Sequence, residues 1–137
     1  MANELLLDTG ALVSLLDKSQ KHHTRFVQYF ESWSGEVVST EAVLTEATHL
    51  LGRAPGGAVA CLDFMLAGGA VLVPSTITSV RRARALMDQY EDLPMDYADA
   101  TLVVLAEELQ TDLIFTTDKR DFSVYRLPGR KRFRIKP

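Results

Sequence analysis

Hydrophobic residues follow two patterns along this chain. In the first, short runs are apolar throughout and are bounded by glycine, proline or polar residues, which is typical of strands buried on both faces of a parallel sheet. Such runs occupy residues 5–7, 37–38, 71–73 and 113–115, and a fifth, at 133–135, is expected at the sheet edge.

In the second pattern, apolar residues recur every three or four positions, as on one face of a helix. Phe26, Phe30 and Trp33 are one example. Helices are predicted at residues 9–17, 24–33, 58–66, 79–90 and 96–110, and one more from a cap at Ser39 or Thr40 to about Gly52. Strands that alternate with helices predict an α/β fold: a mostly parallel sheet of four to five strands with helices on both faces.

The segment LLLDTGA, residues 5–11, suggests a different class of protein, because hydrophobic residues before Asp-Thr-Gly are the signature of aspartic proteases. The pair Gly52-Arg53 adds to that likeness, since retroviral proteases carry a Gly-Arg segment. Aspartic proteases consist almost wholly of β-structure, however, whereas this chain is predicted to be mainly helical. The protease interpretation is therefore rejected, and Asp8 needs another explanation.

Composition sets the broad class. The chain has 137 residues, of which 47% are hydrophobic and 24% charged, as in an ordinary folded protein of one domain. Cys61 is the single cysteine, which excludes an internal disulfide and fits a reducing cytoplasm. Neither a signal peptide nor a membrane span is expected, because Asp8 and Thr9 interrupt the first apolar run.

The net charge of −3 does not indicate nucleic-acid binding, but the basic residues are clustered. One interpretation is a solvated helix face and a charged edge strand that resists aggregation. The other is contact with phosphate groups. The clusters are Arg81, Arg82 and Arg84, and then Arg126, Arg130, Lys131, Arg132, Arg134 and Lys136.

Two aspartates follow predicted strands. Asp8 comes directly after residues 5–7, and Asp118 comes shortly after residues 113–115. Ligands of open parallel sheets bind beyond the carboxyl ends of the strands, so both acids are expected at one rim of the sheet. Asp8 alone has a second interpretation, as a cap for the next helix.

Two further acids lie on the apolar faces of predicted helices. Glu46 shares a ridge with Val43 and Leu50, and Asp99 begins a stripe at i, i+3, i+4 and i+7. An unpaired carboxylate on such a face is costly to bury, which suggests a purpose. For Asp99 the alternative is a first-turn acid of a helix capped by Asp96.

Carboxylates that converge on one rim repel each other unless a cation joins them. Oxygen ligands without cysteine or a histidine pair select a hard ion, Mg²⁺ or Mn²⁺. Metal-assisted cleavage of a phosphodiester is the reaction that suits this arrangement best.

Four segments together resemble the PIN-domain ribonucleases, and most closely the VapC-type toxins of bacterial toxin–antitoxin modules. They stand in the family's order and cover nearly the whole chain. The segments are LLLDTGALVSLLD, STEAVLTEATHLL, MDYADATLVVLAEEL and IFTTDKRDF.

The resemblance assigns roles to these acids. It implies that Asp8, Glu46 and Asp99 bind metal, with Asp118 as the fourth acid and Asp121 close behind it. Asp118 is preferred because it follows the strand more closely. The accessory residues are Asp96, as a further acid or helix cap, and Thr9 and Thr116, whose hydroxyls could orient the carboxylates.

The resemblance also implies that residues 1–137 form a single PIN domain of three α/β/α layers, with Mg²⁺- or Mn²⁺-dependent endoribonuclease activity in the cytoplasm. It implies a homodimer and an antitoxin that blocks the site. The alternative is a PIN-fold module that binds RNA or protein without catalysis. Residues expected to contact RNA are Arg126, Arg130, Lys131, Arg132, Arg81 and Arg82.

Overall fold

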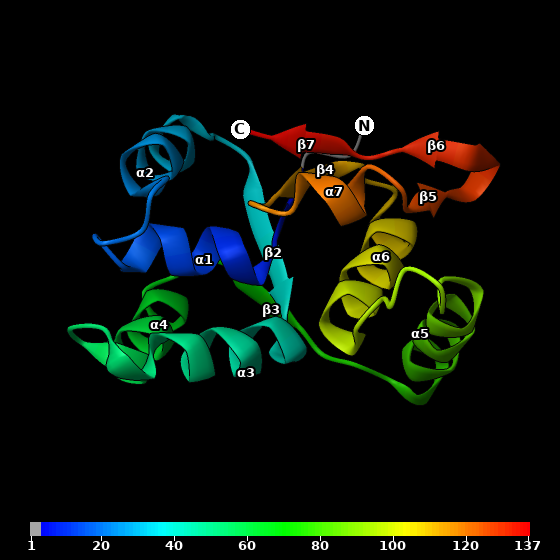
Figure 1. Cartoon of the computed structure of the whole chain (residues 1–137), viewed down its shortest axis with the longest axis horizontal. Coiled ribbons are helices and arrows are strands. Elements are labelled where there is room, and N and C mark those ends of the chain that lie inside the picture. The colour runs from blue at the N-terminus through cyan, green and yellow to red at the C-terminus, as the bar shows by residue number, and fades with distance from the viewer. Residues whose placement is uncertain (1–3) are drawn as a thin grey trace.

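Five parallel strands form the centre of the computed structural model, which describes residues 4–137 (Figure 1). Their order in the sheet is β3-β2-β1-β4-β7, and every neighbouring pair is parallel. The five predicted strands are all present, the edge strand included. They are β1 (Glu4–Leu7), β2 (Glu36–Thr40), β3 (Val71–Val73), β4 (Leu113–Phe115) and β7 (Arg134–Lys136).

The central strands are apolar because both of their faces are covered. Leu6 and Ile114 point into one hydrophobic core, while Leu5, Leu7 and Phe115 point into a second core on the opposite face. Successive side chains of a strand alternate between faces, so a strand between two cores has no polar side. This confirms the predicted sheet with helices on both sides.

Helices on the two faces complete three layers. Figure 1 shows α1 to α4 on one side of β2, and α5 and α6 on the other. Helix α3 contributes to both cores, because Val43 belongs to the first and Ala47 to the second. The helices are α1 (Thr9–Leu16), α2 (His23–Ser32), α3 (Glu41–Leu50), α4 (Gly57–Leu66), α5 (Ile77–Gln89) and α6 (Tyr97–Leu109).

Helix α5 begins two residues before its predicted start because Thr76 caps it. The Thr76 hydroxyl accepts a hydrogen bond from the Ser79 N–H (3.0 Å), and the Ser79 hydroxyl accepts one from the Thr76 N–H (2.8 Å). This reciprocal pair satisfies two backbone donors that a helix start leaves free. Since the helical apolar spacing starts later than the cap, the spacing alone placed the boundary too late.

Several short elements were not predicted, because each is too short to show a periodic pattern. Between β4 and β7 the chain forms the single turn α7 and an antiparallel hairpin of β5 with β6. Within residues 4–137 no helix combines the length and apolar character needed to cross a bilayer. The unpredicted elements are α7 (Lys119–Phe122), β5 (Arg126–Leu127), β6 (Lys131–Arg132) and the 3₁₀ turns η1 (Leu51–Arg53) and η2 (Pro128–Arg130).

Candidate metal centre

The pairing of β1 with β4 joins two distant parts of the chain at the carboxyl edge of the sheet. Leu7 is in register with Phe115, and the Asp8 N–H donates to the Phe115 carbonyl (3.0 Å). Asp8 therefore leaves β1 beside the segment that leads from β4 to Asp118. Open parallel sheets bind their ligands at such an edge.

Asp8 is almost fully buried, with 6% of its surface exposed. It stands at the N-cap position of α1, but its side chain accepts no capping hydrogen bond. Its Oδ2 instead accepts from the Thr116 hydroxyl (2.6 Å), and the Thr116 oxygen accepts from the Asp118 N–H (2.9 Å). Asp8 is thus the N-cap residue by position, but its carboxylate is bonded to Thr116, and an orienting role of Thr116 stays a prediction.

Burial raises the pKa of Asp8 from 3.8 to about 6. The hydrogen bond from Thr116 lowers the pKa in part, and the nearby charges of Asp118 and Glu46 raise it. Ionisation of Asp8 therefore lowers the stability of the folded protein, as expected for a buried acid close to other acids.

Gly10 allows the start of α1 to approach the loop after β4. A Cβ atom at this position would collide with the Thr117 hydroxyl. The Asp-Thr-Gly sequence that resembles a protease signature is therefore explained here by close packing of two segments at the rim of the sheet.

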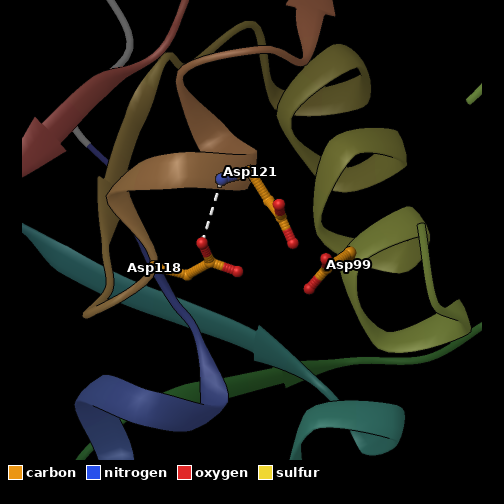
Figure 2. Close-up of side chains that lie close together, drawn as sticks. All are labelled: Asp99, Asp118 and Asp121. Atoms are coloured by element: carbon orange, nitrogen blue, oxygen red, sulfur yellow. Dashed lines mark hydrogen bonds between the residues drawn. The ribbon is translucent and has the colours of Figure 1, made fainter. Parts of the chain in front are cut away.

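Asp99, Asp118 and Asp121 point toward one another across the space between α6 and α7 (Figure 2). One carboxylate oxygen from each lies within 4.8 Å of the other two, and all three residues are half-buried. Asp118 Oδ1 also accepts from the Asp121 N–H (2.9 Å), which caps α7. Asp121, the less favoured fourth acid, thus lies in the same cluster as Asp118.

Asp99 lies in the first turn of α6, and Asp96 is the cap of that helix. Asp96 Oδ1 accepts from the Asp99 N–H (2.8 Å), so of its two expected roles Asp96 has that of the cap. Burial first, and then the charge of Asp8, raises the pKa of Asp99 from 3.8 to about 8.

Tyr125 was missed by sequence reasoning. Its hydroxyl donates to Asp99 Oδ2 (2.7 Å), and this hydrogen bond lowers the pKa of Asp99 in part. Tyr125 follows a helix of one turn and belongs to no periodic stretch, so the sequence carries no signal of its position. Only the folded path from α7 to β5 places it beside α6.

Glu46 and Thr9 have less direct links to the cluster. Glu46 is half-buried on α3, and its charge contributes to the raised pKa of Asp8. Thr9 is buried next to Asp8. Its hydroxyl oxygen is buried without a hydrogen-bond partner, which holds for no other side-chain nitrogen or oxygen atom among residues 4–137.

The donor set fits a hard divalent cation. All the clustered side chains offer oxygen, and the pKa values of Asp8 and Asp99 are raised by burial first and then by the charges of neighbouring acids. A cation held by these oxygens relieves that repulsion, because it favours the ionised carboxylates. The unpaired Thr9 hydroxyl offers one more oxygen beside Asp8.

Several basic residues expected to contact RNA are held by the protein itself. Arg82 pairs with Glu107 (2.9 Å), and Lys131 pairs with the buried Asp112 (3.2 Å). The Arg126 guanidinium donates to the carbonyls of residues 123–125. Arg81, Arg130 and Arg132 are exposed. A contact of these residues with RNA stays a prediction.

Known proteins share this architecture. The family model of the PIN domain matches residues 5–127. Ribonuclease VapC26 of Mycobacterium tuberculosis is 28% identical over 135 residues, which cover 97% of this chain and all of that protein.

Two solved structures show the same fold at lower identity. The VapC20 toxin of M. tuberculosis, which cleaves the sarcin–ricin loop, matches with a TM-score of 0.78 and 19% identity over 85% of this chain and 91% of that one. A toxin–antitoxin complex from Klebsiella pneumoniae matches with a TM-score of 0.66 and 17% identity over 97% and 96%.

Proposed function

Since this chain belongs to the PIN domain family, we propose that it is a metal-dependent endoribonuclease and the toxin of a toxin–antitoxin pair. We further propose that residues 1–137 form one PIN domain, because both hydrophobic cores lie against the same sheet. The similarity to a ribonuclease over 97% of the chain supports the activity.

The convergence of carboxylates at the sheet edge carries the proposal. Three oxygens gather within 4.8 Å of one another. Beside them Asp8 is buried with a raised pKa. A fold under no functional demand gains nothing from such repulsion.

In the proposed site Asp8, Glu46, Asp99 and Asp118 hold Mg²⁺ or Mn²⁺. A bound ion of this kind stabilises charge on phosphoryl oxygens and lowers the pKa of a water molecule. Thr116 fixes the Asp8 carboxylate through its 2.6 Å hydrogen bond. The ion would join the clustered Asp99 and Asp118 to Asp8 and Glu46, and water would cleave the phosphodiester to a 5′-phosphate and a 3′-hydroxyl.

Asp118 remains our choice for the fourth acid. It joins the cluster, and its N–H donates to the Thr116 hydroxyl that holds Asp8, so it is linked directly to the first acid. Asp121 lies within the same 4.8 Å group and serves in the proposal as an accessory acid.

The proposed partners are RNA, a cognate antitoxin and a second copy of the chain, all in the cytoplasm. The solved toxin–antitoxin complex of the same fold supports the antitoxin. Of the residues predicted to contact RNA, Arg81, Arg130 and Arg132 are exposed, and we propose that they bind the RNA backbone.

Cleavage of bacterial total RNA by the purified chain tests the proposal. Wild type is compared with Asp99→Asn and with the control Asp63→Asn, which removes an exposed carboxylate on α4. We expect cleavage in Mn²⁺ or Mg²⁺, none in EDTA, and none by Asp99→Asn. Full cleavage by Asp99→Asn would refute the assigned site. Mn²⁺ binding without cleavage of any RNA would favour the non-catalytic module.

A further inference from the structure

We propose that Tyr125 is a positioning residue of the metal site: its hydroxyl holds Asp99 in place across the gap between α6 and α7. This inference rests on the proposed function, because it concerns the orientation of a proposed metal ligand. The contact that carries it is the 2.7 Å hydrogen bond from Tyr125 Oη to Asp99 Oδ2.

The tyrosine ring is held firmly. None of its surface is exposed, and it packs edge-on against Phe122 and Tyr90, with ring centres 5.2 and 5.1 Å away. Its own N–H donates to the Asp121 carbonyl (3.1 Å). A donor whose ring and backbone are both fixed costs little conformational entropy when it orients a partner.

This hydrogen bond joins the two elements that supply the clustered acids. Asp99 comes from α6, whereas Asp118 and Asp121 come from the segment after β4, to which Tyr125 also belongs. Within the described chain, the three ion pairs found do not include any of these aspartates. When Asp99 is ionised, the hydroxyl of Tyr125 opposes the repulsion that pushes Asp99 away from the other two acids.

Tyr90 provides a matched control. It packs against Tyr125, but its hydroxyl accepts from the Arg126 N–H (2.9 Å) and, within residues 4–137, is not hydrogen-bonded to an acid. Tyr90→Phe and Tyr125→Phe each remove one oxygen and one hydrogen bond while the ring stays. A loss of general packing affects both variants alike, whereas positioning of Asp99 affects only Tyr125→Phe.

The experiment is calorimetric titration of the full chain with Mn²⁺ at fixed pH, for wild type and both variants. Loss of a partner that orients a metal ligand weakens metal affinity by about 10- to 100-fold, so we expect the dissociation constant to rise about tenfold in Tyr125→Phe and to stay within about twofold in Tyr90→Phe. Cleavage by Tyr125→Phe should then need more Mn²⁺ but recover when the ion is in excess.

The outcomes separate the inference from the proposed function. Unchanged Mn²⁺ affinity in Tyr125→Phe, or equal weakening in Tyr90→Phe, overturns the positioning role and leaves the nuclease intact. A wild-type chain without saturable Mn²⁺ binding overturns the proposed function itself. Metal-free melting temperatures of the three proteins report any general loss of stability.

Discussion

Replacement of Asp8 by asparagine should make the metal-free protein more stable while it removes metal-dependent cleavage. Asp8 is 6% exposed, and burial raises its pKa from 3.8 to about 6. Asparagine has nearly the same shape, and its side-chain oxygen can still accept the hydrogen bond from Thr116. The substitution therefore removes the buried charge and little else.

The sign and size follow from proton linkage. The unfolded chain releases the Asp8 proton near pH 4 and the folded chain near pH 6, so the folded state binds more protons between these values. Stability consequently falls as pH rises through that window and is level above it. Each pKa unit corresponds to about 1.4 kcal/mol, so the ionised group costs about 3 kcal/mol. The buried amide N–H offsets part of this, which leaves a gain of about 1 to 3 kcal/mol in Asp8→Asn.

Thermal unfolding in EDTA measures the effect. For a chain of this size the gain corresponds to a rise in Tm of about 3 to 10 °C at about pH 8, shrinking toward zero near pH 4. Asp63→Asn is the control, because it removes an equal but exposed charge. Saturating Mn²⁺ should raise the Tm of wild type and not that of Asp8→Asn. A lower or unchanged Tm for Asp8→Asn at the higher pH would refute the conclusion that this carboxylate is held under repulsion.

Further substitutions test the surroundings of the site. Thr116→Val should lower the free energy of unfolding by about 1 to 2 kcal/mol and the Mn²⁺ affinity about tenfold, because it removes the donor to Asp8 and the acceptor for the Asp118 N–H. Urea unfolding measures the first effect and metal titration the second. An unchanged Mn²⁺ affinity would contradict a role of Thr116 in positioning Asp8. Asp118→Asn should abolish cleavage, whereas Asp121→Asn should only reduce it. Asparagine at position 118 can still cap α7, so the loss would not come from unfolding of this turn. Initial cleavage rates of the two variants measure the difference, and the reverse order would make Asp121 the fourth acid. Ion pairs lower the pKa of Asp112. Their contribution is therefore present at neutral pH and is lost as pH falls through that lowered pKa. Asp112→Asn should lower the free energy of unfolding by about 1 kcal/mol at neutral pH. The effect is small because both cationic partners are exposed. Identical urea unfolding curves of wild type and variant at neutral pH would contradict this prediction.

The strands and the strand-end acids could be predicted because one physical cause fixes both. A strand buried on two faces has to be apolar throughout, as residues 5–7 and 113–115 are, and parallel pairing then brings the residues after them to one edge. The observed pairing of Leu7 with Phe115 brings Asp8 beside the residues that follow β4.

Tyr125 and the ion pairs could not be predicted, because their partners are far away in sequence. The hydroxyl of Tyr125 reaches an acid 26 positions earlier, and Arg82 reaches Glu107, 25 positions later. Neither separation corresponds to a helical or strand period. The sequence shows the basic clusters but not which of their members form ion pairs in the folded protein.

The neighbouring positions of β1, β4 and β7 have a consequence for synthesis of the protein. Thr116, which holds Asp8 from 108 positions away, has its own N–H bonded to the carbonyl of Lys136 in β7. A nascent chain that stops before β4 has three of the four proposed ligands and lacks the segment that brings them together. We therefore expect the growing chain to cleave no RNA before the segment after β4 has been made and has folded against β1.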